Sequence, residues 1–521
     1  MASSTDFVQF ITDQCSGAGE ITARKMFGDY AIYCDGKIFG LVCDDRFYLK
    51  PTHAGRSLLR QVELLPPYEG AKDYFYIADV DDRDYLAQLV SETCKALPHP
   101  KPRKKRAILT ILLVLIASLA GAQNQQVLDQ LKNDPMKAYG TDYPYQLVEH
   151  PQTKAPKGYK PFYISHYSRH GSRYYWTDHL YKELDTLMTV AHNHYQLTDA
   201  GEAFYKKFMA AKQELKTGVS ELTQLGWEQH QGIARIMYNT FPDVFRKGGD
   251  VLAISSLSGR CVLSMSAFCQ ELVQCNPDIE IREQSSRFTL DGVVPTDRQN
   301  PAWRKFPSSK PRYESRRDEF KGGNPIGENV VNRVFISTDS LPLSRRRIGS
   351  SLLNLYTSLP SIGHKGMMEG IVSDQEIASQ WEEANLGGYS WVFGPRYEMI
   401  PILQDIVHKA ADVIEGRSTR RADLRFGHDT CIGPLTVLMG INGADRDPED
   451  PYQVKYCYQN WQTGMASNIQ IIFYRKKGTD PVLVKCLLNG AEATLPLPSQ
   501  QAPYYKWTDF RDFYLKRCQL Q

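Results

Sequence analysis

Two arginines flank a histidine in the segment Arg169-His170-Gly171-Ser172-Arg173. A guanidinium always carries its charge and presents a planar fork of N–H donors that fits the oxygens of a phosphate. Nearby cations lower the pKa of an imidazole and keep it neutral, which a nitrogen nucleophile requires. Gly171 has no Cβ, so we expect the backbone to turn sharply there and come close to a bound group. The segment therefore predicts a pocket for a dianion with a nucleophile at its centre.

The flanking sequence places this segment at the end of a strand. Pro161-Phe162-Tyr163-Ile164 is a short apolar run typical of a buried strand. Downstream, apolar residues recur at helical spacing, namely Leu180, Leu184, Leu187, Met188 and Ala191. Open α/β sheets bind their ligands at loops that leave the carboxyl ends of strands. We therefore expect the segment to lie at such a sheet edge.

Three motifs in this order resemble those of the histidine acid phosphatases, the family that includes phytases and multiple inositol polyphosphate phosphatases. Arg169 to Arg173 is similar to the RHGxR signature of that family. Ser255-Ser256-Leu257-Ser258-Gly259-Arg260 resembles the segment that supplies a third phosphate-binding arginine, and Phe426-Gly427-His428-Asp429-Thr430 resembles the late His-Asp dipeptide. The resemblance covers about residues 143–521.

The resemblance implies a role for six side chains. His170 would attack phosphorus through a ring nitrogen and form a phosphohistidine that water later breaks. Asp429 would be the general acid that protonates the leaving alkoxide, although a helix-capping role stays open because Pro434 follows soon after. Three arginines would offset the negative charge that protects a phosphate monoester from nucleophiles. The phosphate-binding residues are then Arg169, Arg173, Arg260 and His428.

The function expected for this part of the chain is phosphomonoester hydrolysis without a metal or other cofactor, with inositol polyphosphates such as phytate as the substrate. A broad acid phosphatase and a mutase-like or bisphosphoglycerate-directed phosphatase remain alternatives, because the RHG motif also serves that wider superfamily. The inositol polyphosphate branch often carries His-Ala-Glu where this chain has His428-Asp429-Thr430, which leaves the substrate open. Basic residues that could meet further phosphates, or else be solvated surface charge, are Arg304, Lys305, Lys310, Arg312, Arg316, Arg317 and Arg345 to Arg347.

The expected fold of residues 123–521 is α/β, with a central sheet of the phosphoglycerate-mutase-like, histidine phosphatase type and a helical cap inserted into it. Residues 251–254 and 424–426 are apolar and predict two more core strands, and residues 468–474 and 482–488 predict antiparallel additions. We expect the cap within about 178–245 and 277–415, which are helical or irregular in pattern.

Residues 1–100 predict a separate small α+β domain. Residues 31–42 form two strand-like runs joined at Asp35-Gly36, a typical hairpin turn, residues 47–50 predict a third strand, and residues 85–90 begin a closing helix. The stretch resembles the N-terminal domain of the TfoX competence-regulator family. It carries 10 Lys and Arg against 15 Asp and Glu, which disfavours direct DNA contact, so its partner stays open. A non-enzymatic alternative is a membrane-tethered regulator that acts through this domain.

Between these parts lies a segment with the pattern of a secretory signal. Lys101-Pro102-Arg103-Lys104-Lys105-Arg106 is basic, residues 107–120 are apolar, and Ala120-Gly121-Ala122 fits a cleavage site. An internal position indicates either a fusion or read-through of two genes, or an uncleaved signal anchor in which residues 107–122 contact the membrane. We expect the phosphatase part to be periplasmic or secreted and the N-terminal domain to be cytoplasmic.

Composition sets few further limits. The chain has 521 residues, 42% hydrophobic and 23% charged, with a net charge of +3, so nothing in it requires a nucleic-acid partner. Its 11 cysteines form no CxxC pair or cluster at metal-ligand spacing, so no metal is expected. Seven cysteines fall in residues 123–521, so at least one thiol there is expected to stay unpaired.

Overall fold

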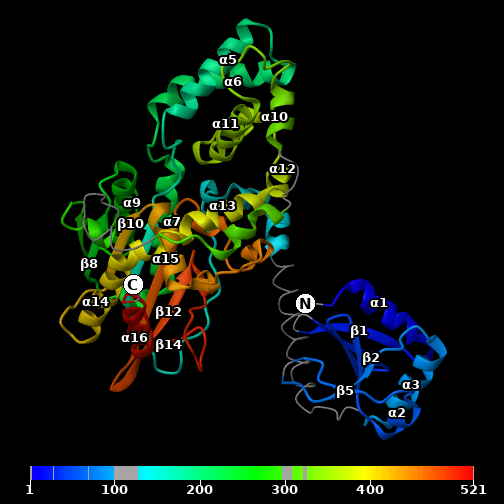
Figure 1. The fold of residues 1–521 in the computed structure, drawn as a ribbon. Helices are drawn as coiled ribbons and strands as arrows, with labels where there is room; N and C mark the ends of the chain where they lie inside the picture. Colours follow the sequence, from blue (N-terminus) through cyan, green and yellow to red (C-terminus); the bar gives the residue numbers. More distant parts are fainter. Residues whose placement is uncertain are drawn as a thin grey trace. The chain divides into compact units, whose positions relative to one another are not determined.

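The computed structural model describes residues 3–26, 29–68, 70–98, 127–295, 308–320 and 326–519. Contacts divide the chain into two compact units, Met1–Leu119 and Ala120–Gln521 (Figure 1). The segment 101–122, expected to direct export or anchor the chain, lies outside the described residues. Within the described ranges, no helix has the length and apolar character needed to span a bilayer.

The N-terminal unit is an antiparallel sheet with helices packed on it, as its pattern predicts. Its strands run in the order β1-β2-β3-β4-β6-β5. Both turn residues between β2 and β3, Asp35 and Gly36, have positive φ (47° and 76°), the conformation of a tight hairpin turn. The elements are α1 (Thr5–Gln14), β1 (Ile21–Met26), β2 (Asp29–Cys34), β3 (Lys37–Cys43), β4 (Arg46–Leu49), α2 (His53–Leu58), β5 (Leu64–Leu65), β6 (Tyr74–Ile77) and α3 (Arg83–Ala96).

The C-terminal unit is built on a mixed sheet in the order β13-β12-β11-β7-β10-β8-β9, with β14 pairing β12. The neighbours β7, β10, β8 and β9 are parallel, and β11, β12 and β13 are antiparallel additions. The predicted α/β class, core strands and antiparallel additions are therefore confirmed. The strands are β7 (Lys160–Arg169), β8 (Gly249–Ser255), β9 (Ile279–Gln284), β10 (Ala422–Gly427), β11 (Asn468–Lys476), β12 (Thr479–Leu488), β13 (Ala491–Ala493) and β14 (Tyr505–Lys506).

Helices cover both faces of this sheet because the strands alternate apolar side chains between two cores. On β7, Ile164 joins the core formed with α7 and α9, and Tyr163 joins the core formed with α14, α15 and α16. The covering helices are α7 (Gln224–Thr240), α8 (Pro242–Phe245), α9 (Gly259–Cys275), α14 (Ile400–Ile414), α15 (Asp429–Met439) and α16 (Trp507–Arg517). Parts of the two ranges expected to form the cap, namely α7, α8, β9 and α14, thus belong to the sheet and its layers.

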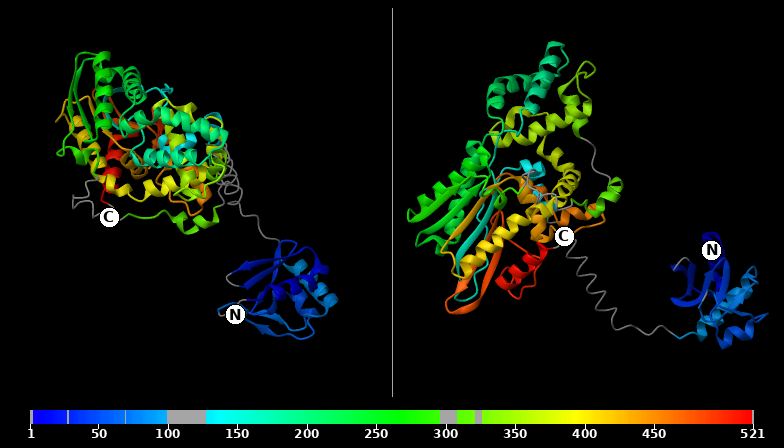
Figure 2. Two further views of the ribbon diagram at one scale, coloured as in Figure 1. Left: turned by 90° about the horizontal axis from the view of Figure 1, so that it is seen from above. Right: turned by 60° about the vertical axis from the view of Figure 1, so that its left-hand side comes forward.

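Most of the remaining helices share a third core away from the sheet, and the last of them, Trp381–Phe393, packs mainly in a separate core. In both figures α5, α6, α10 and α11 gather beyond one end of the strands (Figures 1 and 2). Local sequence fixes several of their starts: the Thr198 hydroxyl accepts from the Gly201 N–H at the start of α6, and Ser373 and Glu376 form a capping box. These elements are α5 (His179–Asn193), α6 (Asp199–Thr217), α10 (Ile326–Val334), α11 (Arg345–Ser358), α12 (Asp374–Ser379) and α13 (Trp381–Phe393).

The cysteines are all free thiols, and every one lies in the described part of the chain. Most are buried, and burial raises the pKa of thiols such as Cys431 and Cys486 to about 12. The unpaired thiol expected among the seven C-terminal cysteines is therefore present, and the other six are unpaired as well.

Candidate active site

The three sequence motifs meet at the carboxyl edge of the parallel strands. Arg169, the last residue of β7, pairs with Gly427 at the end of β10. The His170 N–H then donates to the Gly427 carbonyl at 3.0 Å, and β8 on the other side of β10 pairs Ser255 with Phe426. Because parallel strands end at one edge, the loops after β7, β8 and β10 surround the same space.

His170 is 1% exposed, and its surroundings define which ring nitrogen can react. Nδ1 lies 2.9 Å from the Gly171 carbonyl oxygen, and since a carbonyl only accepts, Nδ1 carries the hydrogen. Burial, followed by the cations Arg169, Arg173 and Arg260, holds the pKa of His170 well below its usual value. The neutral ring therefore has its lone pair on Nε2.

The loop after His170 is fixed by side chains of the two helices beneath it. The Gly171 N–H donates to Ser264 Oγ at 3.0 Å, and the Ser172 N–H donates to Gln229 Oε1 at 2.9 Å. A Cβ on Gly171 would lie 2.4 Å from the Gly226 carbonyl oxygen at the start of α7. The glycine thus serves close packing against this helix, which differs from the expected approach to a bound group.

Arg169 is fully buried and connects three separate segments of the site through hydrogen bonds. Its Nη1 donates to the carbonyl oxygens of Thr141 and Thr463, the latter at 3.1 Å, and its Nη2 donates to Asp429 Oδ2 at 3.2 Å. Burial, together with Arg173 and Arg260 nearby, lowers the pKa of the Arg169 guanidinium.

The three arginines share a feature that favours an anion. Each has a buried Nε with no hydrogen-bond partner in the part of the chain that the structure describes. Arg260 Nη1 donates to Ser220 Oγ at 2.6 Å, and burial is the main cause that lowers the pKa of Arg260. Buried donors are nearly always paired in proteins. Three unpaired guanidinium donors around a neutral imidazole are what a phosphoryl group would satisfy.

His428 lies across the site from His170, with ring centroids 5.6 Å apart. Arg260 Nη2 is 3.4 Å from Nδ1 and can only donate, so Nδ1 is the acceptor and Nε2 carries the hydrogen, 3.0 Å from Ser256 Oγ. Burial and then Arg260 lower the pKa of His428 to about 4. The ring is neutral at neutral pH and held from both sides.

Asp429 is the first residue of α15, and His428 takes the N-cap position. Oδ1 of Asp429 accepts a hydrogen bond from the Thr430 N–H at 3.0 Å. Burial raises the pKa of Asp429, but Arg169, Arg173 and His428 together outweigh it, so the net pKa is lowered. The carboxylate is therefore ionised when only the protein surrounds it.

A cleft of about 780 Å³ opens beside Asp429. Of the basic residues named from the sequence, Arg317 lines this cleft, with Nη1 2.9 Å from Glu314 Oε1. The other described arginines of that set with a recorded ion pair hold surface acids: Arg312 with Glu449, Arg316 with Glu319, Arg345 with Glu328 and Arg347 with Glu183. Arg304 and Lys305 lie outside the described residues.

Sequence reasoning missed the residues that position the reacting groups. Ser220, Gln229 and Ser264 hold the arginine and the loop, although no motif contains them. Ser256, which contacts His428, lies within the segment Ser255 to Arg260 that resembles a family motif, so this resemblance was a reason to consider it. Among the described residues, no group of three or more His, Cys, Asp or Glu could hold a metal ion.

Comparison with known proteins gives a different result for each unit. Residues 13–97 match the model of the TfoX N-terminal domain. An uncharacterized 12.7 kDa protein in the trpE 5′ region of Spirochaeta aurantia is 41% identical over 107 residues, which covers 20% of this chain and 93% of that protein.

The C-terminal unit is similar to solved structures at low sequence identity. Apo multiple inositol polyphosphate phosphatase of Bifidobacterium longum matches with a TM-score of 0.58 and 17% identity over 73% of this chain and 97% of that one. The complex of that enzyme with inositol hexasulfate gives 0.57, with 17% identity and the same coverage. The phytase from D. castellii gives 0.55, with 16% identity over 74% of this chain and 85% of that one.

Proposed function

We propose that the C-terminal unit hydrolyses phosphomonoesters, since it has the fold of the histidine acid phosphatases. Through residues 13–97 the chain belongs to the TfoX N-terminal domain family. Fold alone does not assign an activity, so the proposal depends on the site. The observation that carries it is the neutral His170 ring, which carries its hydrogen on Nδ1 and lies within the electrostatic reach of Arg169, Arg173 and Arg260.

The first step we propose is transfer of the phosphoryl group to His170. Nε2 attacks phosphorus, and the N–P bond forms as the P–O bond to the alcohol breaks. The three arginines bind the phosphoryl oxygens, and their charge stabilises the transition state. His428 joins them when its Nε2 hydrogen turns from Ser256 Oγ to a phosphoryl oxygen. Asp429 gives its proton to the leaving alkoxide, which departs as an alcohol.

The second step returns the enzyme to its starting state. Water attacks phosphorus, the N–P bond breaks, and the Asp429 carboxylate takes the proton that the water loses. Asp429 needs a proton for the first step although the arginines favour its ionised form. A bound phosphate dianion offsets the charge of those arginines, which raises the pKa of Asp429 at the moment when the acid is required.

Inositol polyphosphates are the substrate class we propose. Solved structures with this fold include a phytase and an inositol polyphosphate phosphatase in complex with inositol hexasulfate. The cleft beside Asp429 has room for a leaving group of that size, and Arg317 on its wall can pair with a second phosphate. No step of this mechanism uses a metal.

Phosphate release from phytate and from a simple nitrophenyl ester tests this proposal. We expect turnover of both esters by the full chain, no turnover by His170→Ala, and unchanged rates after treatment with a strong chelator. Rates that fall on chelation and return with a divalent ion would contradict the mechanism. Turnover of the nitrophenyl ester alone would keep the phosphatase activity and remove phytate as the substrate.

We also propose that the phosphatase part is exported through the signal-like segment 101–122, with the N-terminal unit remaining in the cytoplasm if the segment is an uncleaved anchor. The basic, apolar and small-residue pattern of the sequence supports this proposal. Expression in a Gram-negative host should give a periplasmic species that begins near Gln123. Recovery of the uncleaved chain in the soluble cytoplasmic fraction alone would refute it.

A further inference from the structure

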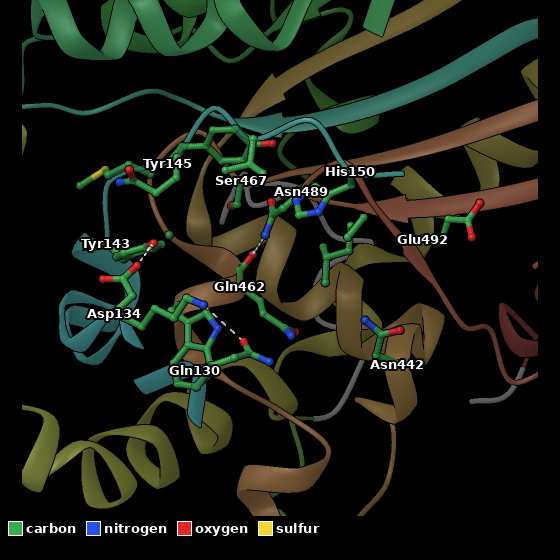
Figure 3. A pocket seen from close by; sticks show the side chains of 18 residues that line it. Gln130, Asp134, Tyr143, Tyr145, His150, Asn442, Gln462, Ser467, Asn489 and Glu492 are labelled. Atoms are coloured by element: carbon green, nitrogen blue, oxygen red, sulfur yellow. Dashed lines mark hydrogen bonds between the residues drawn. The ribbon is translucent and has the colours of Figure 1, made fainter. Parts of the chain in front are cut away.

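A second pocket is lined in part by the loop 463–467, whose backbone contacts Arg169 and His170. It encloses about 360 Å³, a volume within the range of small-molecule sites. Three segments far apart in sequence line it: residues 130–150, residues 461–467 and residues 488–492, together with Asn442. Figure 3 shows Gln130, Gln462 and Asn489, one from each segment, around the same space.

The lining of this pocket is unlike that of the active site. It holds five carboxamides, from Gln130, Gln146, Asn442, Gln462 and Asn489. The amide of Asn489 is hydrogen-bonded within the wall, to the Asn468 N–H and the Gln462 carbonyl, so the other four are the ones that can meet a ligand. The charged side chains of the lining are two carboxylates, Asp134 and Glu492, and one ammonium, Lys137, and Glu492 pairs with Lys485 at 2.9 Å, so the charges balance. The pocket therefore has no excess positive charge to attract phosphate or other anions. Within the described chain no group of side chains there could hold a metal ion.

Carboxamides and rings together favour a particular ligand chemistry. A carboxamide offers both N–H donors and a carbonyl acceptor, which matches a hydroxyl group, itself both a donor and an acceptor. Trp461, Tyr143 and Tyr145 add aromatic surface that can lie against the C–H face of a ring. A small neutral molecule with several hydroxyls satisfies this lining without bringing in charge.

Two further observations mark the pocket as built for a ligand. Ser467 is 1% exposed and lines the pocket, and its Oγ has no hydrogen-bond partner in the described part of the chain. Three non-glycine residues on or beside its wall, Asn442, Ala466 and Asn489, have φ near +54°. Asparagine adopts this conformation readily, so the strained residue is Ala466, and strained backbone clusters at functional sites.

The pocket and the active site lie on opposite sides of one loop. Thr463 and Ser467 accept hydrogen bonds from Arg169, and the Ala466 N–H donates to the His170 carbonyl at 2.9 Å. The same loop turns Gln462, Gly464 and the side chain of Ser467 to the pocket. A molecule bound there would therefore be separate from the phosphoryl group, with the loop between them.

We infer that this pocket binds a small neutral polyol, such as a free cyclitol or a monosaccharide, at a site distinct from the catalytic cleft. The inference does not depend on the proposed hydrolysis, because binding can be measured in a chain that cannot turn over. If the proposed function holds, the alcohol released at the active site belongs to the same chemical class as the ligand of this pocket.

Calorimetric titration of myo-inositol and of D-glucose into the full-length His170→Ala chain tests the inference. We expect saturable binding of at least one of them with a Kd of about 1 mM or tighter. Saturating inorganic phosphate should leave this binding unchanged, because phosphate occupies the other side of the loop. Absence of saturable binding by both polyols, or competition with phosphate, would overturn the inference.

Substitutions in the pocket wall test whether the polyol binds in this pocket. Gln146 is exposed and Gln130 half-buried, so the double change Gln130→Ala and Gln146→Ala removes two carboxamides with little effect on the core. We expect the double variant to bind the polyol at least about tenfold more weakly, given the usual contribution of two hydrogen bonds. Gln213→Ala, on the exposed face of α6, is the matched control and should bind normally. Equal affinity in all three chains would contradict a site in this pocket.

Discussion

Asp429 Oδ2 lies 3.2 Å from Nη2 of the fully buried Arg169. The contact ties the first residue of α15 to the last residue of β7, so the group that would give a proton is held by a group that would bind phosphate. The same contact favours the ionised carboxylate. We infer that Asp429 gains its proton only when a phosphate dianion offsets the charge of Arg169, which would couple substrate binding to the acid.

The pH dependence of turnover should reflect the lowered pKa of His170. Because burial and three arginines keep this ring neutral, the nucleophile remains available well below pH 6.5. We expect the pH profile of kcat/KM for a nitrophenyl ester, which reports groups of the free enzyme, to show no histidine ionisation between pH 7 and about pH 5. A fall in kcat/KM with an apparent pKa near 6.5 would mean that His170 titrates as an ordinary histidine.

Stability should fall over part of the same pH range. His166 and His230 are buried without hydrogen-bond partners among the described residues, and burial lowers the pKa of His230 to about 3. An unfolded histidine titrates near pH 6.5, so from there down to about pH 3 the unfolded chain takes up a proton that the native state refuses. Stability is therefore lost as the pH falls, by roughly 3 kcal/mol at pH 4 for His230.

Tryptophan fluorescence can follow this loss, because all seven tryptophans lie beyond residue 175 and report the C-terminal unit alone. His230→Leu should show a smaller drop in Tm between pH 6.5 and pH 4 than the unchanged chain. His408→Leu, on the exposed face of α14, is the control and should retain the full drop. An equal drop in Tm between pH 6.5 and pH 4 in the two variants would show that His230 does not cause the loss of stability.

Arg317 should contribute to selectivity for a polyphosphate. It lines the cleft beside Asp429, which its neighbour Arg316 does not, although both are paired with an acid, Arg317 with Glu314 and Arg316 with Glu319. We expect Arg317→Ala to raise KM for phytate about tenfold, the loss of one charge-assisted contact, and to leave KM for a nitrophenyl ester unchanged. Arg316→Ala should change neither. A rise for both esters in Arg317→Ala would indicate a structural effect on the site.

Gly171 should tolerate no side chain. A Cβ there would lie 2.4 Å from the Gly226 carbonyl oxygen, so Gly171→Ala forces the loop or α7 to shift. We expect a loss of about 1–3 kcal/mol in stability, together with a large loss of kcat as His170 moves. In Gly366→Ala a Cβ would meet nothing within 4 Å, so Tm and kcat should both stay the same. Normal kcat in Gly171→Ala would mean that the packing relaxes freely.

Local patterns predicted the framework of the site well. The run Pro161 to Ile164 marks β7, and since parallel strands end at one edge, the position of His170 follows from it. The strand β9 escaped prediction because its sequence Ile279-Glu280-Ile281-Arg282-Glu283-Gln284 is mostly polar, as suits an edge strand with exposed side chains. Helix α7 lies within a range predicted as cap from its helical or irregular pattern, whereas in the structure its buried face, which includes Gln229 and His230, packs on the sheet.

Contacts distant in sequence could not be predicted. The Thr463 carbonyl that accepts from Arg169 lies 294 residues away along the chain, and no motif connects the two. The same holds for the Gly226 backbone against Gly171, which is set by how α7 packs on the loop. Motifs identify reacting groups by their chemistry, whereas the groups that position them depend on the tertiary packing.

In the mechanism that we propose, His170 becomes covalently phosphorylated and Asp429 acts as the acid. Mixing Asp429→Asn with a nitrophenyl ester and quenching rapidly tests both roles. A nitrophenolate can leave without a proton, whereas an alkoxide needs one from the general acid. We predict a phosphoenzyme that disappears in Asp429→Asn/His170→Ala, with turnover of alkyl esters reduced by about 10²–10⁴-fold and of nitrophenyl esters far less. No trapped phosphoenzyme, or equal losses for alkyl and nitrophenyl esters, would contradict the account.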